Sequence, residues 1–202
     1  MIIYGSKMYG VKNVVWGFGA CQHCGVYAKH KSYNGKKFGH LYFIPLIPMG
    51  GSVRVMQECV KCKMARHMPE TSVGPLYQRI ESLMGACVAA AEQGEHTFSD
   101  GESDEPVGTG AFLLDAIELM YVAGYHREVD DLVALFDSDA ARYEHALARG
   151  VLKEIRSGKA DAISYFQQAI EAAPDEVLPY LLASDLSANT GNAQQSLDYL
   201  DQ

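Results

Sequence analysis

Two closely spaced cysteine pairs are the residues of this chain best suited to chemistry. Two residues separate Cys21 from Cys24 and Cys59 from Cys62, and 34 residues lie between the pairs. A two-residue spacer lets one tight turn direct two thiolates at the same ion, and zinc binds four such sulfurs at tetrahedral corners about 2.3 Å away. Gly25 follows the first pair and can adopt the positive φ that such a turn needs. The spacing therefore predicts one structural zinc ion, bound by Cys21, Cys24, Cys59 and Cys62, with no open position for water.

Other interpretations of these cysteines are an iron site, redox-active dithiols, or thiols unrelated to one another. Histidines in the same part of the chain have no ligand spacing, and one falls inside a cysteine pair, where side chains usually point outward. We therefore expect none of them to be a ligand: His23, His30, His40 and His67. The fifth cysteine, Cys87, lies in an apolar helical run and is expected to be buried as a small hydrophobic residue.

Strands are predicted on the chain segments that lead to the cysteine pairs. Residues 11–18 are rich in valine and aromatic residues, and residues 53–57 alternate apolar and polar side chains. The apolar stretch between them contains Pro45 and Pro48, which cannot donate ladder hydrogen bonds. We expect a bent edge strand there that leads to a turn at Gly50-Gly51.

Residues 1 to about 68 resemble a small zinc-ribbon family. The matching features are the opening Met1-Ile-Ile-Tyr-Gly5, the two Cys-x-x-Cys pairs, and Phe43-Ile-Pro-Leu-Ile-Pro48 followed by Gly50. The resemblance implies a zinc-bound β-ribbon. It implies no reaction, because the family has no catalytic assignment to transfer.

From Thr71 onward the composition becomes helical, rich in Ala, Leu, Glu and Gln. Pro75 can start a helix over about residues 76–93. Residues 94–108 are acidic and rich in turn-forming residues, which indicates a linker or mobile loop. We favour a solvated connection over a binding segment for this stretch.

A period of 34 residues runs through the rest of the chain. Each unit has a small residue where two helices would cross, a turn between the helices, and a bulky apolar residue eight positions later. These are, in order, Ala116, Gly150 and Ser184, then Gly124, Gly158 and Asn192, then Leu132, Phe166 and Leu200. The spacing resembles the tetratricopeptide repeat over residues 109–142, 143–176 and a truncated 177–202. The resemblance implies a groove that binds a protein segment, and a helical bundle with accidental periodicity is the alternative.

The net charge of −8 is divided unevenly along the chain. Residues 1–70 carry ten Lys and Arg against two acidic residues, whereas residues 71–202 carry seven against 23. Such asymmetry suggests different partners for the two parts, or contact between them. The start lacks the pattern of a signal peptide and no run of 18 apolar residues occurs, so we expect a cytoplasmic protein. Paired cysteines in that reducing compartment favour metal binding over disulfides.

These observations predict an α+β protein in two parts. A zinc ribbon is expected over residues 1–70, a helix and acidic linker over 71–108, and tetratricopeptide-like repeats over 109–202. The sequence shows no phosphate-binding loop, nucleophile elbow or His-Glu-x-x-His pair, so we expect no enzyme. The favoured function is a non-catalytic adaptor that binds a protein partner, with self-association as a further expectation.

The leading alternative is nucleic-acid binding by the basic ribbon. Four lysines are concentrated near three aromatic residues, a combination suited to phosphate contacts and base stacking. They are Lys29, Lys31, Lys36 and Lys37, close to Tyr27, Tyr33 and Phe38. A less favoured alternative is contact of residues 41–49 with a membrane or another subunit, a stretch too short to span a bilayer.

Overall fold

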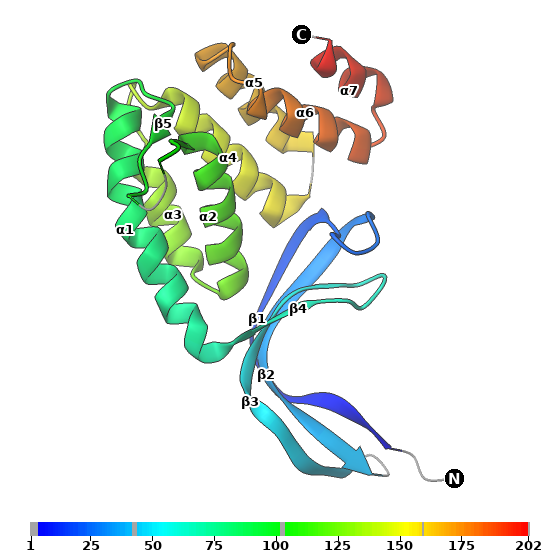
Figure 1. Cartoon of the computed structure of the whole chain (residues 1–202). Helices are drawn as coiled ribbons and strands as arrows, with labels where there is room; N and C mark the ends of the chain where they lie inside the picture. Colours follow the sequence, from blue (N-terminus) through cyan, green and yellow to red (C-terminus); the bar gives the residue numbers. More distant parts are fainter. Residues whose placement is uncertain (1–3, 42–43, 102–103, 159, 202) are drawn as a thin grey trace. The chain divides into compact units, whose positions relative to one another are not determined.

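The computed structural model describes residues 4–41, 44–101, 104–158 and 160–201. The chain is an α+β protein in two parts, as predicted: a four-stranded antiparallel sheet is followed by seven described α-helices (Figure 1). Backbone contacts divide it into two compact units. The first, here called the sheet unit, contains Met1–Gln78 and Val122–Gly124, and the second, the helical unit, contains Arg79–Tyr121 and Tyr125–Gln202.

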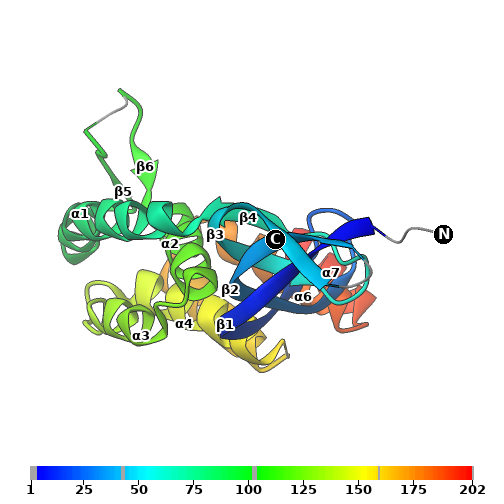
Figure 2. The same ribbon diagram turned by 90° about the horizontal axis from the view of Figure 1, so that it is seen from below.

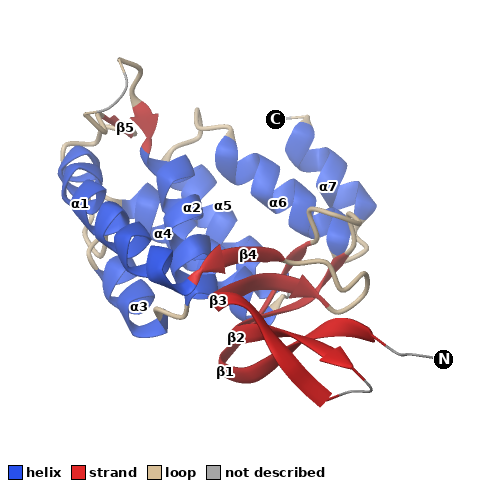
Figure 3. Ribbon diagram, turned by 60° about the horizontal axis from the view of Figure 1, so that its bottom comes forward, coloured by secondary structure: helices blue, strands red, loops and turns tan. Residues whose placement is uncertain are grey.

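The sheet is a meander in which each strand pairs with the next one along the chain (red in Figure 3). Its strands are β1 (Tyr4–Ala20), β2 (Tyr27–Leu41), β3 (Ile44–Cys59) and β4 (Arg66–Pro69). The strands predicted around residues 11–18 and 53–57 are confirmed, within β1 and β3. Because β1 and β3 both run antiparallel to β2, the ends of β1 and β3 come to the same edge of the sheet.

The turn predicted at Gly50-Gly51 is wrong, because β3 continues through both glycines. Lys36 of β2 lies opposite Ser52, whereas Phe38 lies opposite Pro48, so β3 has extra residues between these two pairs. Gly50 has a φ of 91°, in the region that glycine adopts without a steric cost. The two glycines therefore form a β-bulge in a long strand.

The prolines of β3 lie in the part of that strand that has a pairing strand on one side only. β4 pairs only with Val53–Met56 of β3, so the segment with Pro45 and Pro48 is paired with β2 alone. This agrees with the predicted edge strand, since proline cannot donate to a second ladder. The predicted apolar surface over residues 41–49 falls mostly on side chains outside the described residues.

The helical unit begins within α1 (Val73–Glu92), which agrees with the helix predicted after Pro75. Residues 94–108 are not a simple solvated connection, because β5 (Thr97–Phe98) and β6 (Val107–Gly108) pair as a short hairpin between α1 and α2 (Figure 2). Phe98 is buried and its ring meets Phe112 edge-on, with the ring centroids 5.2 Å apart. This ring contact anchors the hairpin to α2.

Six further helices follow as three successive pairs. They are α2 (Thr109–Ala123) with α3 (His126–Ala134), α4 (Arg142–Ser157) with α5 (Ile163–Ala172), and α6 (Leu178–Asn189) with α7 (Ala193–Leu200). The predicted turns fall between paired helices: Gly124 and Gly158 have φ of 103° and 60°, and the Asn192 side chain caps α7. The α4–α5 and α6–α7 pairs pack closely, whereas α2 and α3 contact each other less.

The small residues of the repeat pattern lie where the pattern predicts. The bulky residue of the pattern is buried in the first two pairs and exposed in the last one. Gly150 of α4 lies against the ring of Phe166 of α5, and Phe166 is fully buried. Leu132 is buried as well, but Leu200 is 56% exposed, contrary to the prediction. Tyr199 is the buried residue of α7 instead, and its hydroxyl accepts a hydrogen bond from Gln167 of α5.

Candidate metal centre

The four cysteines of the two pairs lie together at one edge of the sheet. Their Sγ atoms are all within 4.8 Å of one another, and those of Cys21 and Cys62 are 3.7 Å apart. The convergence follows from the topology: Cys21 directly follows β1 and Cys59 ends β3, and the two strands end at the same edge. Each pair thus occupies the turn that leaves its strand.

The first turn folds back on Cys21. The amide of Gly25 donates to the Cys21 carbonyl (2.8 Å), and the amide of Cys21 donates to the Val26 carbonyl (3.0 Å). Gly25 has a φ of 69°, as expected from its place after the pair. The His23 amide points at Cys21 Sγ at 3.4 Å, which stabilises negative charge on that sulfur.

The second turn repeats the first, bond for bond. The amide of Lys63 donates to the Cys59 carbonyl (3.0 Å), the amide of Cys59 donates to the Met64 carbonyl (3.0 Å), and the Lys61 amide points at Cys59 Sγ (3.4 Å). Lys63 has a φ of 62° at the position that Gly25 occupies in the first turn. A lysine there holds a left-handed conformation that glycine adopts without steric cost.

The pKa values of the Cys21 and Cys62 thiols are shifted in opposite directions. Backbone amides, that of Cys24 first and that of His23 second, lower the pKa of Cys21 to about 6. The Met64 amide favours the Cys62 thiolate, but burial and hydrogen bonds with the neighbouring thiols raise the pKa of Cys62 to about 11. Four thiolates at this spacing repel one another, and a divalent cation at their centre would offset that repulsion.

The donor set fits a tetrahedral metal ion. Four sulfurs about 2.3 Å from a zinc ion lie about 3.8 Å from one another, close to the separation of Cys21 and Cys62. Cys21 and Cys59 are buried, Cys62 is half-buried and Cys24 is exposed, so the site lies at the surface of the sheet unit. Four close cysteines of this kind could hold a metal ion.

The described histidine side chains near the cysteines are not part of the cluster. Among the described residues, the only group of three or more His, Cys, Asp or Glu side chains with ligand spacing consists of the four cysteines. His23 and His67 are exposed. His30 is buried beside Cys21 and hydrogen-bonds to its thiol, which supports the sulfur from outside the cluster. The side chain of His40 lies outside the described residues.

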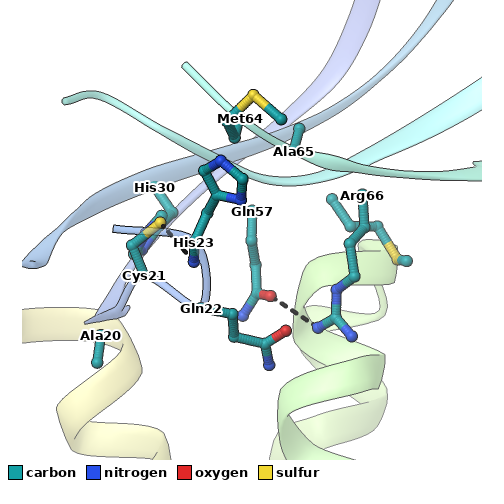
Figure 4. A pocket seen from close by; sticks show the side chains of 10 residues that line it. Ala20, Cys21, Gln22, His23, His30, Gln57, Met64, Ala65 and Arg66 are labelled. Carbon is teal, nitrogen blue, oxygen red and sulfur yellow. Dashed lines mark hydrogen bonds between the residues drawn. The ribbon is translucent and has the colours of Figure 1, made fainter. Parts of the chain in front are cut away.

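A small cavity lies beside the first turn (Figure 4). Its volume is about 270 Å³, and its lining includes Cys21, His23 and Met64. One wall is fixed by a hydrogen bond of 3.0 Å from Arg66 Nη2 to Gln57 Oε1, drawn as a dashed line in Figure 4. The first turn of the cysteine cluster therefore forms part of the wall of a recess on the sheet unit.

Some of the lysines and aromatic residues proposed for nucleic-acid binding contact other protein side chains, and others are exposed. Lys31 pairs with Glu58 at 2.9 Å, and the buried Tyr33 donates to the same carboxylate at 2.6 Å. Lys29 is exposed and its Nζ lies 4.5 Å from the centroid of the Trp16 ring. Tyr33 is therefore inaccessible to a base, whereas Lys29 and Trp16 form a cation–π pair at the surface.

Sequence reasoning missed a buried arginine in β3. Arg54 is 1% exposed, and burial lowers the pKa of its guanidinium below the usual range. Its Nη1 donates to the Asn13 carbonyl and to Asn34 Oδ1, and its Nε donates to the Val122 carbonyl, all within the sheet unit. The only signal was a charged residue at a position of β3 between two valines.

A buried carboxylate in the helical unit was missed as well. Glu144 of α4 is fully buried, and its Oε1 accepts from Thr109 Oγ1 (3.0 Å) and lies 3.0 Å from His96 Nδ1. The amide of Thr109 donates to the His96 carbonyl at 2.8 Å. This network fastens the β5–β6 hairpin to α4.

Cys87 is fully buried in α1, as predicted.

No helix in the described part of the chain is long and apolar enough to cross a membrane. Comparison with protein-family models, curated proteins and solved structures gives no significant match for this chain. The geometry of the cysteine cluster and of the helix pairs is therefore the basis for any functional argument.

Proposed function

We propose that this chain is a non-catalytic adaptor, with a zinc-bound β-ribbon and tetratricopeptide-like helix pairs that bind a protein partner. The observation that supports it best is the four-cysteine cluster, whose sulfurs lie within 4.8 Å of one another. Four thiolates fill the coordination sphere of a tetrahedral zinc ion and leave no position for a reactive water. In this proposal the metal fixes the two turns and the edge of the sheet, and does no chemistry.

The helix pairs support the second half of the proposal. Three pairs follow one another with starts at Thr109, Arg142 and Leu178, close to the 34-residue period of the sequence. The contact of Gly150 with Phe166 is the kind of small-to-large packing that holds the two helices of such a pair together. Stacked helix pairs present extended surfaces that suit a protein segment better than a small molecule. The proposal also expects a reducing compartment such as the cytoplasm, where paired cysteines stay free to bind metal.

Zinc content and partner capture test this proposal. We expect purified protein to contain about one zinc ion per chain by mass spectrometry of the metal. Tagged intact protein should capture a specific protein partner from native extract, and the partner should stay bound after nuclease treatment. A chain without zinc, or capture no different from that of an unrelated tagged protein, would contradict the proposal.

Nucleic-acid binding is the second candidate function, favoured by the cation–π pair of Lys29 and Trp16 on the surface of the sheet. Trp16 is the single tryptophan of the chain, so a base that stacks on it should quench its fluorescence. Affinity for single-stranded oligonucleotides should fall steeply with salt and should weaken in Lys29→Gln. Lys7→Gln, at another exposed lysine, serves as the control. An affinity that changes with neither salt nor either substitution would exclude this function.

A further inference from the structure

The last helix pair carries a group of exposed apolar side chains around one cavity. Val177 precedes α6, Leu181 lies in its first turn and Leu200 ends α7. These residues are 65%, 46% and 56% exposed, and all three line a cavity of about 340 Å³. Single exposed leucines are ordinary, but three large apolar side chains around a shared hollow are typical of a binding site.

The walls of this cavity are held in place. Tyr180 donates its hydroxyl to the Pro174 carbonyl at 3.2 Å. Tyr199 is buried, and its hydroxyl accepts from Gln167 Nε2 at 2.8 Å. Both tyrosines line the cavity together with the exposed apolar residues. A site whose walls are already ordered loses less conformational entropy when a ligand binds.

The charged residues that line the cavity are both acidic. Asp175 and Glu176 line it directly. Residues 160–202 contain seven acidic residues and no Lys, Arg or His, so the last helix pair supplies no basic side chain to pair with them. Such a field attracts cations and repels phosphodiesters, anionic lipids and acidic peptides. The apolar hollow and the acidic rim together fit a ligand that is both apolar and positively charged.

We propose that this surface, here called the terminal face (Val177, Leu181 and Leu200 with Asp175 and Glu176), binds a basic amphipathic helix of a protein partner. The inference rests on the proposed adaptor function and deepens it by naming the chemistry of the partner. Apolar side chains spaced by three or four residues would enter the cavity, as helices do in apolar grooves. Lysines and arginines that flank them would meet the two carboxylates at the rim.

Selection from a random peptide library tests the terminal face without knowledge of the partner. The immobilised full-length protein is offered displayed peptides of about 15 residues, long enough for about four helical turns. We expect the enriched peptides to carry net positive charge and apolar residues at helical spacing. The best of them, made synthetically with a fluorescent label, is then titrated by anisotropy at low and high salt.

The decisive comparison is between two variants with exposed leucines replaced. In Leu181→Ser/Leu200→Ser the affinity for the selected peptide should fall at least tenfold, about 1.4 kcal/mol. Leu135→Ser, also at an exposed leucine of the helical unit but outside this cavity, should bind like the wild type. Because all three leucines are exposed, these variants should keep the wild-type helical circular dichroism.

Three outcomes would overturn the inference. They are the enrichment of no peptide or of acidic peptides, equal affinity in the double variant, and a double variant that converts a dimer into a monomer, which would make a second copy the occupant. The adaptor proposal fails separately, when no nuclease-resistant partner is captured. If a partner is captured but binds the double variant unchanged, the adaptor proposal stands and the terminal face is rejected.

Discussion

A β-carbon on Gly150 would lie 2.5 Å from Cε1 of Phe166, closer than folded proteins allow. Gly150 is in the middle of α4, where glycine costs about 1 kcal/mol of helix stability relative to alanine. The sequence tolerates that cost because a hydrogen side chain lets the fully buried ring of Phe166 approach the α4 backbone. The pair thus explains, at atomic level, why a small residue recurs in the 34-residue pattern.

Gly150→Ala should therefore destabilise the helical unit, although it improves helix propensity. Overpacking costs up to about 3 kcal/mol, and a β-carbon 2.5 Å from a buried ring belongs at that end, above the gain of about 1 kcal/mol from propensity. Gly85 of α1 is the matched control, because a β-carbon there meets nothing within 4 Å. Gly85→Ala should raise the midpoint of urea unfolding and Gly150→Ala should lower it. Equal shifts in the same direction would mean that the Gly150–Phe166 contact does not limit the packing.

Cys59→Ser should abolish metal binding and unfold the sheet unit while the helical signal remains. Cys59 is fully buried in the cluster, and a serine hydroxyl is a poor ligand for a metal that prefers thiolates. Zinc content by mass spectrometry and far-ultraviolet circular dichroism measure the two effects. Cys87→Ala removes a cysteine outside the cluster and should retain the metal. Wild-type zinc content in Cys59→Ser would contradict a shared four-cysteine site.

Lys63→Gly should stabilise the metal-bound sheet unit. Lys63 has a φ of 62°, and a left-handed conformation costs a non-glycine residue about 1 kcal/mol. Gly25 occupies the equivalent place in the first turn with a φ of 69°. The reciprocal change Gly25→Ala should therefore destabilise the unit by a similar amount. Thermal unfolding at saturating zinc measures both effects. A loss of stability in Lys63→Gly would show that the Lys63 side chain contributes more to stability than its left-handed backbone conformation costs.

The local rules of metal ligation made the cysteine cluster predictable, whereas the details of the sheet were not. Each Cys-x-x-Cys spacing indicates a turn that presents two thiolates to one ion, and the meander of β1, β2 and β3 brings the two turns together. The path between them depends on bulges, such as the one at Gly50, whose positions are set by pairing with β2. A Gly-Gly pair is typical of a turn in most contexts, and only the partner strand shows that it is a bulge here.

The helix pairs were predictable from periodicity, but the phase of the last one was not. Gly150 and Phe166 lie where the 34-residue period places them, because packing of two helices imposes the spacing. In α7 the interior position shifts by one residue, to Tyr199, whose hydroxyl finds a partner in Gln167. The burial of Arg54 and Glu144 was hard to predict from local sequence, since groups distant in the chain satisfy both side chains.

Cys87 should be unreactive in the folded protein and should make stability depend on pH in the alkaline range. Burial first, and the nearby Glu144 carboxylate second, raise the pKa of the Cys87 thiol from 9.0 to about 12. A raised pKa in the folded state stabilises the fold fully below pH 9, and this contribution is lost as the pH rises towards 12. Between pH 8 and pH 10 the free energy of unfolding of the wild type should therefore fall relative to that of Cys87→Ala. Alkylation followed by peptide mass spectrometry should label Cys87 only after unfolding, and rapid labelling of the native protein at pH 8 would contradict its burial.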